Sequence, residues 1–473
     1  GAKSGVYPER TGGGTMTVHA PRILLAAPSS GAGKTTVTCA ILRAFHRRGL
    51  HLAAFKCGPD YIDPMFHREV LGVPSTNLDL FLLGEDMVRQ ILLEHARGAA
   101  FSLLEGAMGY YDGIDFTERA GSYDLARATR TPVVLIVDGR GAAQSLLAQV
   151  KGFLTYRTDS RIAGVIWNRL SPSLYPALQQ RLEQEFGIRS LGFLPKMDAA
   201  VLESRHLGLV TAAEVDKLQQ KMDCLAEQAE RTVDLDGLLA VAQQAEPLSQ
   251  EGLELPERGR GRPRIAVARD RAFCFYYADS LRLLERLGAE LCLFSPLTDA
   301  ALPPGCSGML LGGGYPELYA AELERNAPMR ESVRAAVQDG MPCVAECGGF
   351  LYLHRTLEDA QGISHQMVGA IAADGKRTNR LQRFGYATLT ALRDNLLCKA
   401  GERIPIHEFH YWESTDSGNA FQAEKASNGR TWPCIHTAET LFAGFPHIHF
   451  CSNPRWAQRF LAACVQYEEA QKS

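Results

Sequence analysis

The sequence lacks an excess of charge of either sign and any long apolar run, and each absence excludes a class of protein. Its 473 residues hold 50 Lys and Arg against 53 Asp and Glu, a formal net charge of −3. The basic footprint of a nucleic-acid-binding protein is therefore missing. No apolar run approaches the roughly 18 residues that cross a bilayer, so we expect no membrane partner. A hydrophobic content of 46% also excludes a disordered chain.

Paired-cysteine motifs and a secretion signal are absent too. The twelve cysteines are scattered, with no CxxC pair and no metal-type spacing. Residues 1–15 are Gly-rich and polar, without the apolar core of a signal peptide. We therefore expect reduced thiols in a cytoplasmic protein, at least one of which is free to act as a nucleophile. Residues 1–19 are expected to be an extension or a tag remnant.

Short apolar runs alternate with helical lengths, which predicts an α/β fold with parallel sheets. Residues 246–263 are rich in Pro, Gly and charge, as in an exposed linker. This divides the chain into a first domain, 20–245, and a second, 264–473. Strands are expected at Ile23–Ala27, Leu52–Lys56, Phe101–Glu105, Val133–Asp138, Ile162–Trp167, Ile265–Ala268, Glu290–Phe294, Met309–Leu311 and Pro342–Glu346. Helices are expected at Ala213–Gln244 and Trp456–Gln471.

A phosphate-binding loop is predicted between the first strand and the first helix. In the segment APSSGAGKTT, Gly31 and Gly33 let backbone N–H groups point at phosphate oxygens. Lys34 would reach the β- and γ-phosphates of ATP, and Thr35 would hold Mg²⁺, with Thr36 beside it. The strict pattern has Gly where this chain has Pro28. The alternative is an ordinary Gly/Ser turn that caps a helix.

Charged and polar residues follow the neighbouring strands at the same sheet edge. Asp60 and Glu105 end the second and third strands and are candidate Mg²⁺ ligands. Lys56 is a candidate catalytic residue that would neutralise charge on a transferring phosphoryl group. Asn168 follows a later strand and would read the adenine edge, although a turn-forming Asn is an equal alternative.

A second chemical site is predicted around Cys347. The segment VAECGGFLYL places this thiol between a strand and a helix, on a sharp turn where the helix dipole favours thiolate. A thiolate nucleophile needs a base, and His447 and His449 are the candidates. They are expected to alternate on one strand, so only one of them can face Cys347. Backbone N–H groups of Gly313, Gly314 and Gly348 are candidates for an oxyanion and glutamine site.

Together the two sites predict glutamine-dependent amide synthesis. The thiol would hydrolyse glutamine and release ammonia, while ATP would convert a carboxylate into an acyl phosphate that ammonia attacks. Phosphorylation is needed because a carboxylate resists nucleophiles and its oxygen is a poor leaving group. Ammonia must pass between the sites shielded from water, because free ammonia would be protonated.

Several motifs resemble the cobyrinate a,c-diamide synthase family of corrin biosynthesis over nearly all of residues 20–470. The matching segments are AAPSSGAGKTT (26–36), FKCGPDYIDP (55–64), EGAMGYYDG (105–113), RHLGL (205–209), AFCFYY (272–277), GGGYPE (312–317), AECGGFLYL (345–353), LQRFGYAT (381–388), HEFHY (407–411) and HIHF (447–450). The resemblance implies a P-loop domain like dethiobiotin synthetase and a class I-type glutamine amidotransferase domain. It also implies a Cys347–His447 pair without the usual third acidic member.

The same resemblance implies a corrinoid acid as substrate, either cobyrinate or hydrogenobyrinate, with its a- and c-acetates amidated in turn. It suggests substrate contacts around Tyr61, Tyr110 and Gly121–Tyr123. One departure concerns Pro446, where the family usually has Leu, because Pro lacks a backbone donor. The alternatives are a nickel-sirohydrochlorin diamide synthase, a cobyrate synthase, a stand-alone thiol hydrolase or a P-loop switch ATPase of the partitioning type. A homodimer is compatible with the sequence.

Overall fold

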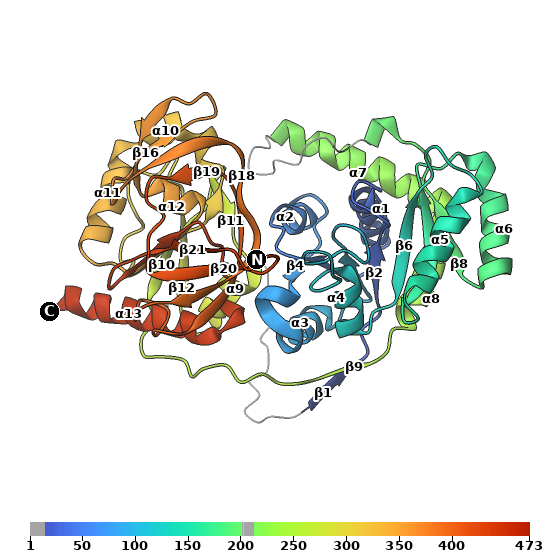
Figure 1. Ribbon diagram of the computed structural model, residues 1–473, viewed down its shortest axis with the longest axis horizontal. Coiled ribbons are helices and arrows are strands. Elements are labelled where there is room, and N and C mark those ends of the chain that lie inside the picture. The colour runs from blue at the N-terminus through green and yellow to red at the C-terminus, as the bar shows by residue number, and fades with distance from the viewer. Residues whose placement is uncertain (1–14, 201, 203–211) are drawn as a thin grey trace.

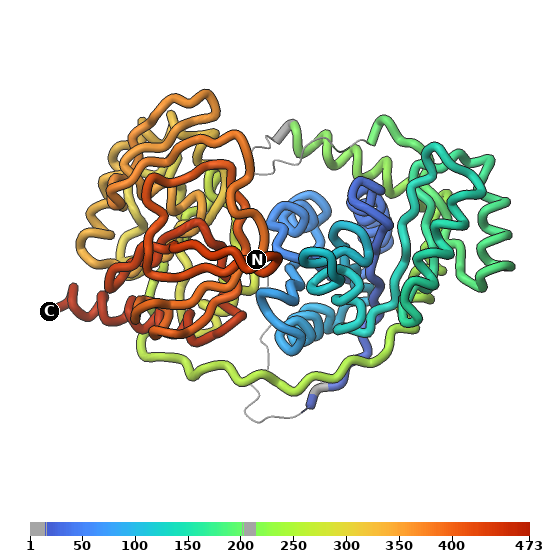
Figure 2. Tube along the Cα trace, viewed as in Figure 1, coloured from blue at the N-terminus to red at the C-terminus, as the bar shows by residue number. Residues whose placement is uncertain are grey.

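The computed structural model describes residues 15–200, 202 and 212–473, and these form two lobes joined by a single connection (Figure 1). The N lobe, blue to green, precedes the connection, and the C lobe, yellow to red, follows it (Figure 2). Within the described ranges, no helix is both long and apolar enough to span a membrane.

The N lobe is built on a seven-stranded, wholly parallel sheet with the order β4-β3-β5-β2-β6-β7-β8. Its strands are β2 (Arg22–Ala26), β3 (Leu52–Cys57), β4 (Ser75–Leu78), β5 (Phe101–Glu105), β6 (Val133–Asp138), β7 (Ile162–Asn168) and β8 (Arg189–Phe193). The predicted parallel sheet is therefore confirmed. Sequence analysis missed β4, because its sequence STNL is polar although every residue in it is buried.

Helices cover both faces of this sheet (Figure 1). They are α1 (Lys34–Arg47), α2 (Ile62–Glu69), α3 (Leu80–Ala96), α4 (Ser122–Thr129), α5 (Ser145–Tyr156), α6 (Tyr175–Phe186), α7 (Ala212–Thr232) and α8 (Leu235–Gln243). The single long helix expected over Ala213–Gln244 is two helices. The Asp234 carboxylate accepts a hydrogen bond from Gly237 N at 2.9 Å and so caps the start of α8, where the chain turns.

The connection between the lobes has structure of its own. Strand β1 (Thr15–Val18) pairs antiparallel with β9 (Leu248–Glu251), which lies within the segment expected to be a linker. Beside this pair, the buried Arg22 guanidinium donates to the carbonyl oxygens of Thr129 and Glu246 at 2.8 and 2.9 Å. Burial lowers the pKa of Arg22 to about 10. Residues 15–18 therefore have a defined place against the connection.

The C lobe holds a six-stranded sheet with the order β12-β10-β13-β15-β23-β22, in which only β22 runs antiparallel. Its strands are β10 (Arg264–Ala268), β12 (Glu290–Phe294), β13 (Gly308–Leu311), β15 (Cys343–Glu346), β22 (His436–Thr437) and β23 (Leu441–Gly444). Its helices are α9 (Ala278–Arg286), α10 (Ala320–Arg325), α11 (Ala327–Gln338), α12 (Gly348–Tyr352) and α13 (Pro454–Lys472). A short pair, β11 (Phe273–Phe275) and β14 (Gly313–Gly314), lies beside it.

A second C-lobe sheet was not predicted from the sequence. It consists of β16 (His354–Glu358), β17 (Ser364–Gln366), β18 (Ile371–Ala391), β19 (Arg403–Ser414), β20 (Phe421–Lys425) and β21 (Thr431–Cys434). The long hairpin of β18 and β19 stands on the side of the C lobe that faces the N lobe (Figure 1).

Buried polar contacts join the two lobes. The Asp279 carboxylate at the start of α9 accepts hydrogen bonds from Thr76 and from His95 Nε2, which lies 2.8 Å away. Nearby, the Tyr386 hydroxyl donates to Asp79 at 2.6 Å. Because Asp79 directly follows β4, these contacts bring the C lobe against the carboxyl edge of the N-lobe sheet, where ligands bind in open α/β folds.

Candidate active sites

The phosphate-binding loop has the backbone shape that its glycines predict. Gly31 and Gly33 have φ of +79° and +95°, and Gly33 is the N-cap of α1. A Cβ atom at Gly33 would lie 2.0 Å from Asn168 Nδ2, so only glycine fits there. The Asn168 amide donates to Ala32 O at 3.0 Å. Asn168 therefore supports the loop, and its contact with adenine stays a prediction.

Lys34 is the first residue of α1. It donates to the carbonyl oxygen of Met108 at 2.6 Å. Burial, followed by the nearby charge of Lys56, lowers the pKa of Lys34 to about 8. Its charge is therefore poorly compensated by the neighbouring side chains, as expected for a group that meets an anion. Thr35 and Thr36 follow in the first turn of the same helix.

Glu105 at the end of β5 is the centre of a buried ionic cluster. Its Oε1 accepts a hydrogen bond from Thr35 Oγ1 at 2.9 Å and lies 3.6 Å from Lys56 Nζ. Its Oε2 lies 3.1 Å from His67 Nε2. Burial alone would raise the pKa of Glu105, but the Lys56 charge and the His67 hydrogen bond hold it well below its usual range. The Glu105 side chain is therefore a carboxylate.

Lys56 lies in the same cluster as a buried cation. Its ammonium group contacts Asp63 Oδ2 at 2.9 Å and donates to Gly106 O at 3.2 Å. Burial opposes the charge, but Glu105 and Asp63 more than offset it and raise the pKa of Lys56. The importance of Asp63 and His67 was not predicted from the sequence. Their place in FKCGPDYIDPMFH, one helical turn apart after the β3 loop, was the only signal.

Asp60 has a local role that the structure shows directly. Its Oδ1 accepts hydrogen bonds from the backbone N–H groups of Ile62 and Asp63 at 2.7 and 3.2 Å, which caps α2. Asn77 holds the same loop by donating to the Asp60 carbonyl oxygen at 2.6 Å. The loop that carries Asp60 is therefore fixed at the sheet edge.

One pair of oxygen donors at the phosphate loop suits Mg²⁺. The structure describes no group of three or more His, Cys, Asp or Glu side chains suited to a metal. Thr35 Oγ1 and Glu105 Oε1, 2.9 Å apart, are nevertheless hard oxygen donors at the phosphate loop. Because Mg²⁺ usually takes one or two protein oxygens and completes its shell with phosphates and water, this pair fits the ion.

Cys347 stands on a strained elbow between β15 and α12. Its φ of 47° and ψ of −101° are unfavourable for a residue with a side chain. The backbone N–H of Cys347 donates to Gly444 O at 2.8 Å, and its sulfur lies 4.0 Å from Phe409 O. Of the twelve free cysteines, it is the one placed at such a turn. The elbow that the sequence pattern predicts is present.

The three glycines expected to form an oxyanion site lie together. A Cβ atom at Gly348 would lie 3.1 Å from Gly314 N, and one at Gly313 would lie 2.9 Å from His447 Cε1. Side chains are therefore excluded where backbone N–H groups and the imidazole approach each other. Gly312 lies away from this contact, against Tyr276.

His447 is buried and lies at the boundary between the lobes. Its Nδ1 lies 3.5 Å from Glu346 Oε2 and has no hydrogen-bond partner among the described residues. Its backbone exchanges hydrogen bonds with His407, at 2.9 and 3.3 Å. The expectation that His447 and His449 alternate on a strand is wrong. Strand β23 ends at Gly444, and only this isolated bridge follows Pro446.

His449 lies in a different environment. Its ring stacks on Tyr277 with centroids 4.9 Å apart, and its Nδ1 accepts a hydrogen bond from Cys451 N at 3.1 Å. Burial lowers the pKa of His449 to about 4. Its Nδ1 is therefore used to cap the turn at Phe450–Ser452, and the ring is neutral at physiological pH. Of the two histidines, His447 has the contacts with the glycine cluster.

Three carboxylates near the thiol were missed. Burial raises the pKa of Cys347, and the charges of Glu317, Glu408 and Glu346 raise it further. Burial also raises the pKa of Glu317 to about 7. These residues stand inside the motifs GGGYPE, HEFHY and AECGG, so position in a motif was the available signal. The acidic surroundings hold the resting thiol in its protonated form.

Tyr61 comes from the N lobe but packs among residues of the C lobe. Its ring stacks on Phe275 and Tyr277, with centroids 5.0 and 4.4 Å away, and lies 5.2 Å from the ring of His447. Next to it is a cavity of about 30 Å³, lined also by Glu346, Leu310 and Val344. A space of this size holds a molecule no larger than water or ammonia. Tyr61 directly follows Asp60, so the loop after β3 reaches from the edge of the N-lobe sheet to His447 of the C lobe.

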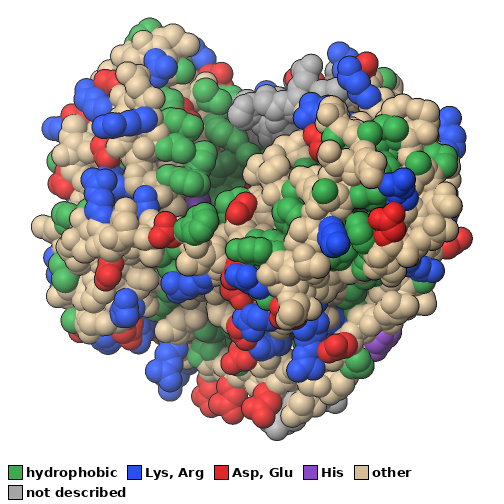
Figure 3. Space-filling view, turned by 45° about the vertical axis from the view of Figure 1, so that its right-hand side comes forward, with side chains coloured by type: hydrophobic (Ala, Val, Ile, Leu, Met, Phe, Trp, Pro, Cys, Tyr) green, Lys and Arg blue, Asp and Glu red, His purple; other side chains and the backbone are tan. Residues whose placement is uncertain are grey.

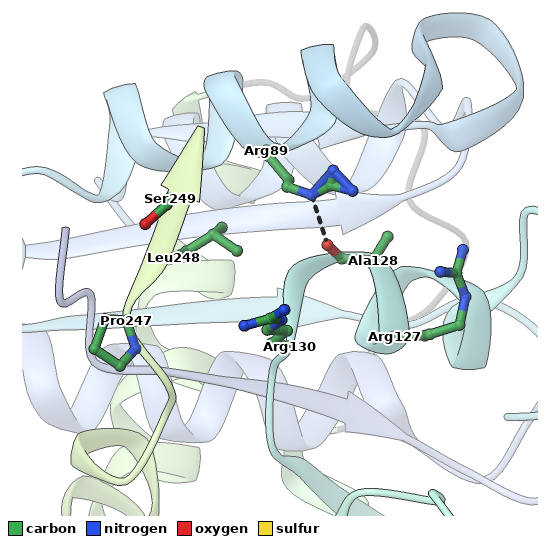
Figure 4. A pocket seen from close by; sticks show the side chains of 7 residues that line it. All are labelled: Arg89, Arg127, Ala128, Arg130, Pro247, Leu248 and Ser249. Atoms are coloured by element: carbon green, nitrogen blue, oxygen red, sulfur yellow. Dashed lines mark hydrogen bonds between the residues drawn. The ribbon is translucent and has the colours of Figure 1, made fainter. Parts of the chain in front are cut away.

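A larger cavity, of about 360 Å³, lies away from both sites. Arg89, Arg127, Ala128, Arg130, Pro247, Leu248 and Ser249 line it (Figure 4). The arginines are paired: Arg89 and Arg127 contact Glu85, and Arg130 lies 3.7 Å from Glu246. Arg89 also donates to the carbonyl oxygen of Ala128, as drawn in Figure 4. The three arginine charges at this cavity are therefore matched by carboxylates of the same lobe.

Both lobes match known domain families. Residues 23–209 match the CobQ/CobB/MinD/ParA nucleotide-binding domain, and residues 264–455 match the CobB/CobQ-like glutamine amidotransferase domain. The segment RHLGL (205–209), noted in the sequence, falls outside the described residues. The two matches agree with the P-loop and thiol-elbow interpretations of the two lobes.

Curated relatives match over nearly the whole chain. A cobyrinate a,c-diamide synthase from Caldanaerobacter subterraneus is 38% identical, covering 94% of this chain and 98% of that protein. Proteins of the same name from Listeria innocua and Salmonella typhimurium are each 40% identical. They cover 92% and 95% of this chain and 97% and 99% of their own lengths.

Proposed function

Because the chain belongs to the cobyrinate a,c-diamide synthase family, we propose that it amidates the a- and c-acetate carboxylates of cobyrinate or hydrogenobyrinate. It is a glutamine-dependent amide ligase with a nucleotide-binding N lobe and a glutamine amidotransferase C lobe. The observation that carries the proposal is that Tyr61, in the loop after β3 at the edge of the N-lobe sheet, packs against Tyr277 and His447 of the C lobe.

In the N lobe, a substrate carboxylate attacks the γ-phosphorus of ATP, which releases ADP and leaves an acyl phosphate. The loop N–H groups and Lys34 hold the phosphates, and Lys56 offsets negative charge at the sheet edge. Thr35, Glu105 and Asp60 are the residues proposed to hold Mg²⁺, which when bound neutralises phosphate charge. Glu105 and Lys56 already lie 3.6 Å apart at this sheet edge, so their side chains need to move little for phosphoryl transfer.

In the C lobe, the sulfur of Cys347 attacks the side-chain carbonyl of glutamine. His447 takes the thiol proton and passes it to the departing amine, which leaves as ammonia, and a γ-glutamyl thioester remains on Cys347. Water then hydrolyses the thioester to glutamate and restores the thiol. The N–H groups of Gly348, Gly313 and Gly314 are proposed to stabilise the oxyanion. Glu346, 3.5 Å from His447 Nδ1, would hold the imidazole in the tautomer that accepts this proton.

Ammonia then attacks the acyl phosphate and displaces phosphate, which forms the amide. The cavity beside Tyr61 supports a sheltered route, because it extends from the residue before Cys347 to the loop that carries Asp60. Its lining is mostly aromatic and aliphatic, so uncharged ammonia enters more readily than ammonium.

The direct test supplies the purified protein with ATP, glutamine and cobyrinate and follows the products by mass spectrometry. Each turnover replaces a hydroxyl group by an amino group, so the diamide is distinguished from the monoamide and from the starting acid. Nickel-sirohydrochlorin and the a,c-diamide are offered in parallel as competing substrates. Preferred turnover of either one would overturn the assignment of cobyrinate. Cytoplasmic location and a homodimer remain predictions.

A further inference from the structure

The outward face of the β18–β19 hairpin carries aromatic side chains that are exposed within the described part of the chain. Along β19, Ile406, Glu408 and His410 are buried in the C lobe, so the alternate residues point the other way. Phe409 and Tyr411 on that outward face are 49% and 44% exposed, and Phe384 on β18 is 47% exposed. We call these three residues the aromatic wall. Three large rings exposed side by side are typical of a binding surface.

The aromatic wall continues from the contact between the lobes. It extends a row of rings that begins in the N lobe, with centroids 4.6 to 6.0 Å apart, in the order Phe81, Tyr386, His407, Phe384, Phe409 and Tyr411. Hydrophobic side chains line the C-lobe side of the notch between the lobes (Figure 3). The wall thus extends the row of rings at the lobe contact along the exposed face of the hairpin.

The wall lies close to the thiol site. The carbonyl oxygen of Phe409 on β19 is 4.0 Å from the sulfur of Cys347. At the opposite end of the row, Arg119 stands over the ring of Phe81 at 5.3 Å. A molecule on the wall would therefore lie between the source of ammonia and the sheet edge of the N lobe.

The end of the wall near Tyr411 is basic. Arg377 and Arg380 on β18 are exposed, and neither forms an ion pair with a residue in the described part of the chain. Arg383 is different, because its guanidinium pairs with Glu408 and Glu413. The Thr378 hydroxyl donates to the backbone oxygens of Arg380 and Tyr411, which fixes the basic turn beside the wall. The surface thus combines apolar ring faces with two free cations.

We propose that the aromatic wall binds the face of the corrinoid acid, while Arg377 and Arg380 bind carboxylates on its rim. A corrinoid acid has the matching chemistry, with a broad apolar ring face and carboxylate side chains around its edge. The inference rests on the proposed function and adds to it, because it gives the C lobe a share in substrate binding.

The test measures binding of cobyrinate to the full chain by equilibrium dialysis, without ATP or glutamine. Phe409→Ala is expected to raise the Kd for cobyrinate by about tenfold, the loss typical of one ring stacked on a flat ligand. Phe384→Ala should act in the same direction. Arg380→Gln should raise Kd and make binding less sensitive to salt. Ile363→Ala is the control, because Ile363 is 59% exposed but lies in the β16–β17 turn.

The outcomes separate this inference from the proposed function. KM for ATP and for glutamine should stay within about twofold in Phe384→Ala and Arg380→Gln, because among the described residues these two side chains contact neither the phosphate loop nor Cys347. If the unaltered chain amidates cobyrinate, but Phe409→Ala and Phe384→Ala bind it as tightly as the unaltered chain does, the proposal for the wall is overturned and the proposed function stands. An enzyme that neither binds nor amidates cobyrinate would overturn both. If the variants change only the sedimentation of the protein, the wall is a contact between copies of the chain, and this outcome also overturns the proposal.

Discussion

The ring of Tyr61 lies 5.2 Å from the imidazole of His447, although one residue belongs to the phosphate-binding lobe and the other to the thiol-bearing lobe. Tyr61 follows Asp60, whose carboxylate caps α2, so its position depends on the loop at the sheet edge. Any shift of that loop on nucleotide binding would therefore move the Tyr61 ring relative to the imidazole of His447.

Replacing Tyr61 should therefore uncouple the two reactions. In Tyr61→Ala the two ring stacks are lost, each about 0.5–1.5 kcal/mol, and the small cavity opens. We expect the ratio of glutamate released to amide formed to rise about fivefold, measured by chromatography of both products from one reaction. Tyr61→Phe is the matched control, because it keeps the stacks and should keep the ratio. A ratio unchanged in Tyr61→Ala would show that Tyr61 does not link the sites.

Removal of the thiol should affect one nitrogen source only. Cys347→Ala should lower glutamine-supported amidation by on the order of 10⁴-fold, while synthesis from ammonium salts continues. The control is Cys343→Ala, a buried cysteine on the preceding strand, which should retain both activities. Full glutamine-supported turnover in Cys347→Ala would refute the assignment of the nucleophile.

Glu346 is expected to orient His447, since its carboxylate lies 3.5 Å from Nδ1. Glu346→Gln keeps the size but removes the charge that stabilises the imidazolium. Glutaminase kcat should fall by on the order of tenfold to a hundredfold, with its pH profile displaced and ammonium-supported synthesis unchanged. Glu424→Gln, an exposed change on β20, serves as the control. If glutaminase kcat and its pH profile are both unaltered, Glu346 has no part in this step.

ATP binding should depend on pH through Lys34, whose pKa is lowered to about 8 by burial and by Lys56. Phosphate binding favours the ammonium form of Lys34. Above about pH 8, the ATP complex therefore holds more protons than the free enzyme. The Kd for ATP should therefore rise toward tenfold per pH unit above about 8. Titration calorimetry measures both Kd and proton uptake. Lys34→Arg keeps its charge and should give a flat profile in the same range, whereas a flat profile in the unaltered chain would contradict the prediction.

Asp279 should stabilise the joined lobes. Burial alone would raise its pKa, but the hydrogen bonds from His95 and Thr76 lower the pKa of Asp279 to about 2. A carboxyl pKa that is lowered on folding stabilises the fold at pH values above the pKa of the unfolded chain, about 4. This contribution disappears as pH falls through about 2. Asp279→Asn should therefore cost about 2 kcal/mol in urea unfolding at neutral pH. Asp236→Asn is the exposed control, and equal unfolding of the two variants would refute the role.

The sequence predicts the parts of the structure where a local pattern sets the geometry. Gly31, Gly33 and Lys34 were located because a phosphate loop needs those residue types in that order, and Cys347 because an elbow needs glycines after the nucleophile. The position of His449 was not predicted, because Pro446 ends the strand and the chain then turns. Glu346, Glu408 and Tyr61 act through contacts between distant segments, which spacing alone does not reveal.

The pairing of β1 with β9 bears on how this chain should be handled. Trimming the chain at residue 20, as is done to discard a tag, would remove β1 and leave β9, in the connection between the lobes, without its hydrogen-bonding neighbour. The connection would then lengthen and the lobes would separate more easily. We therefore expect a shortened enzyme to release ammonia to solvent instead of using it for amidation, even with every catalytic group intact.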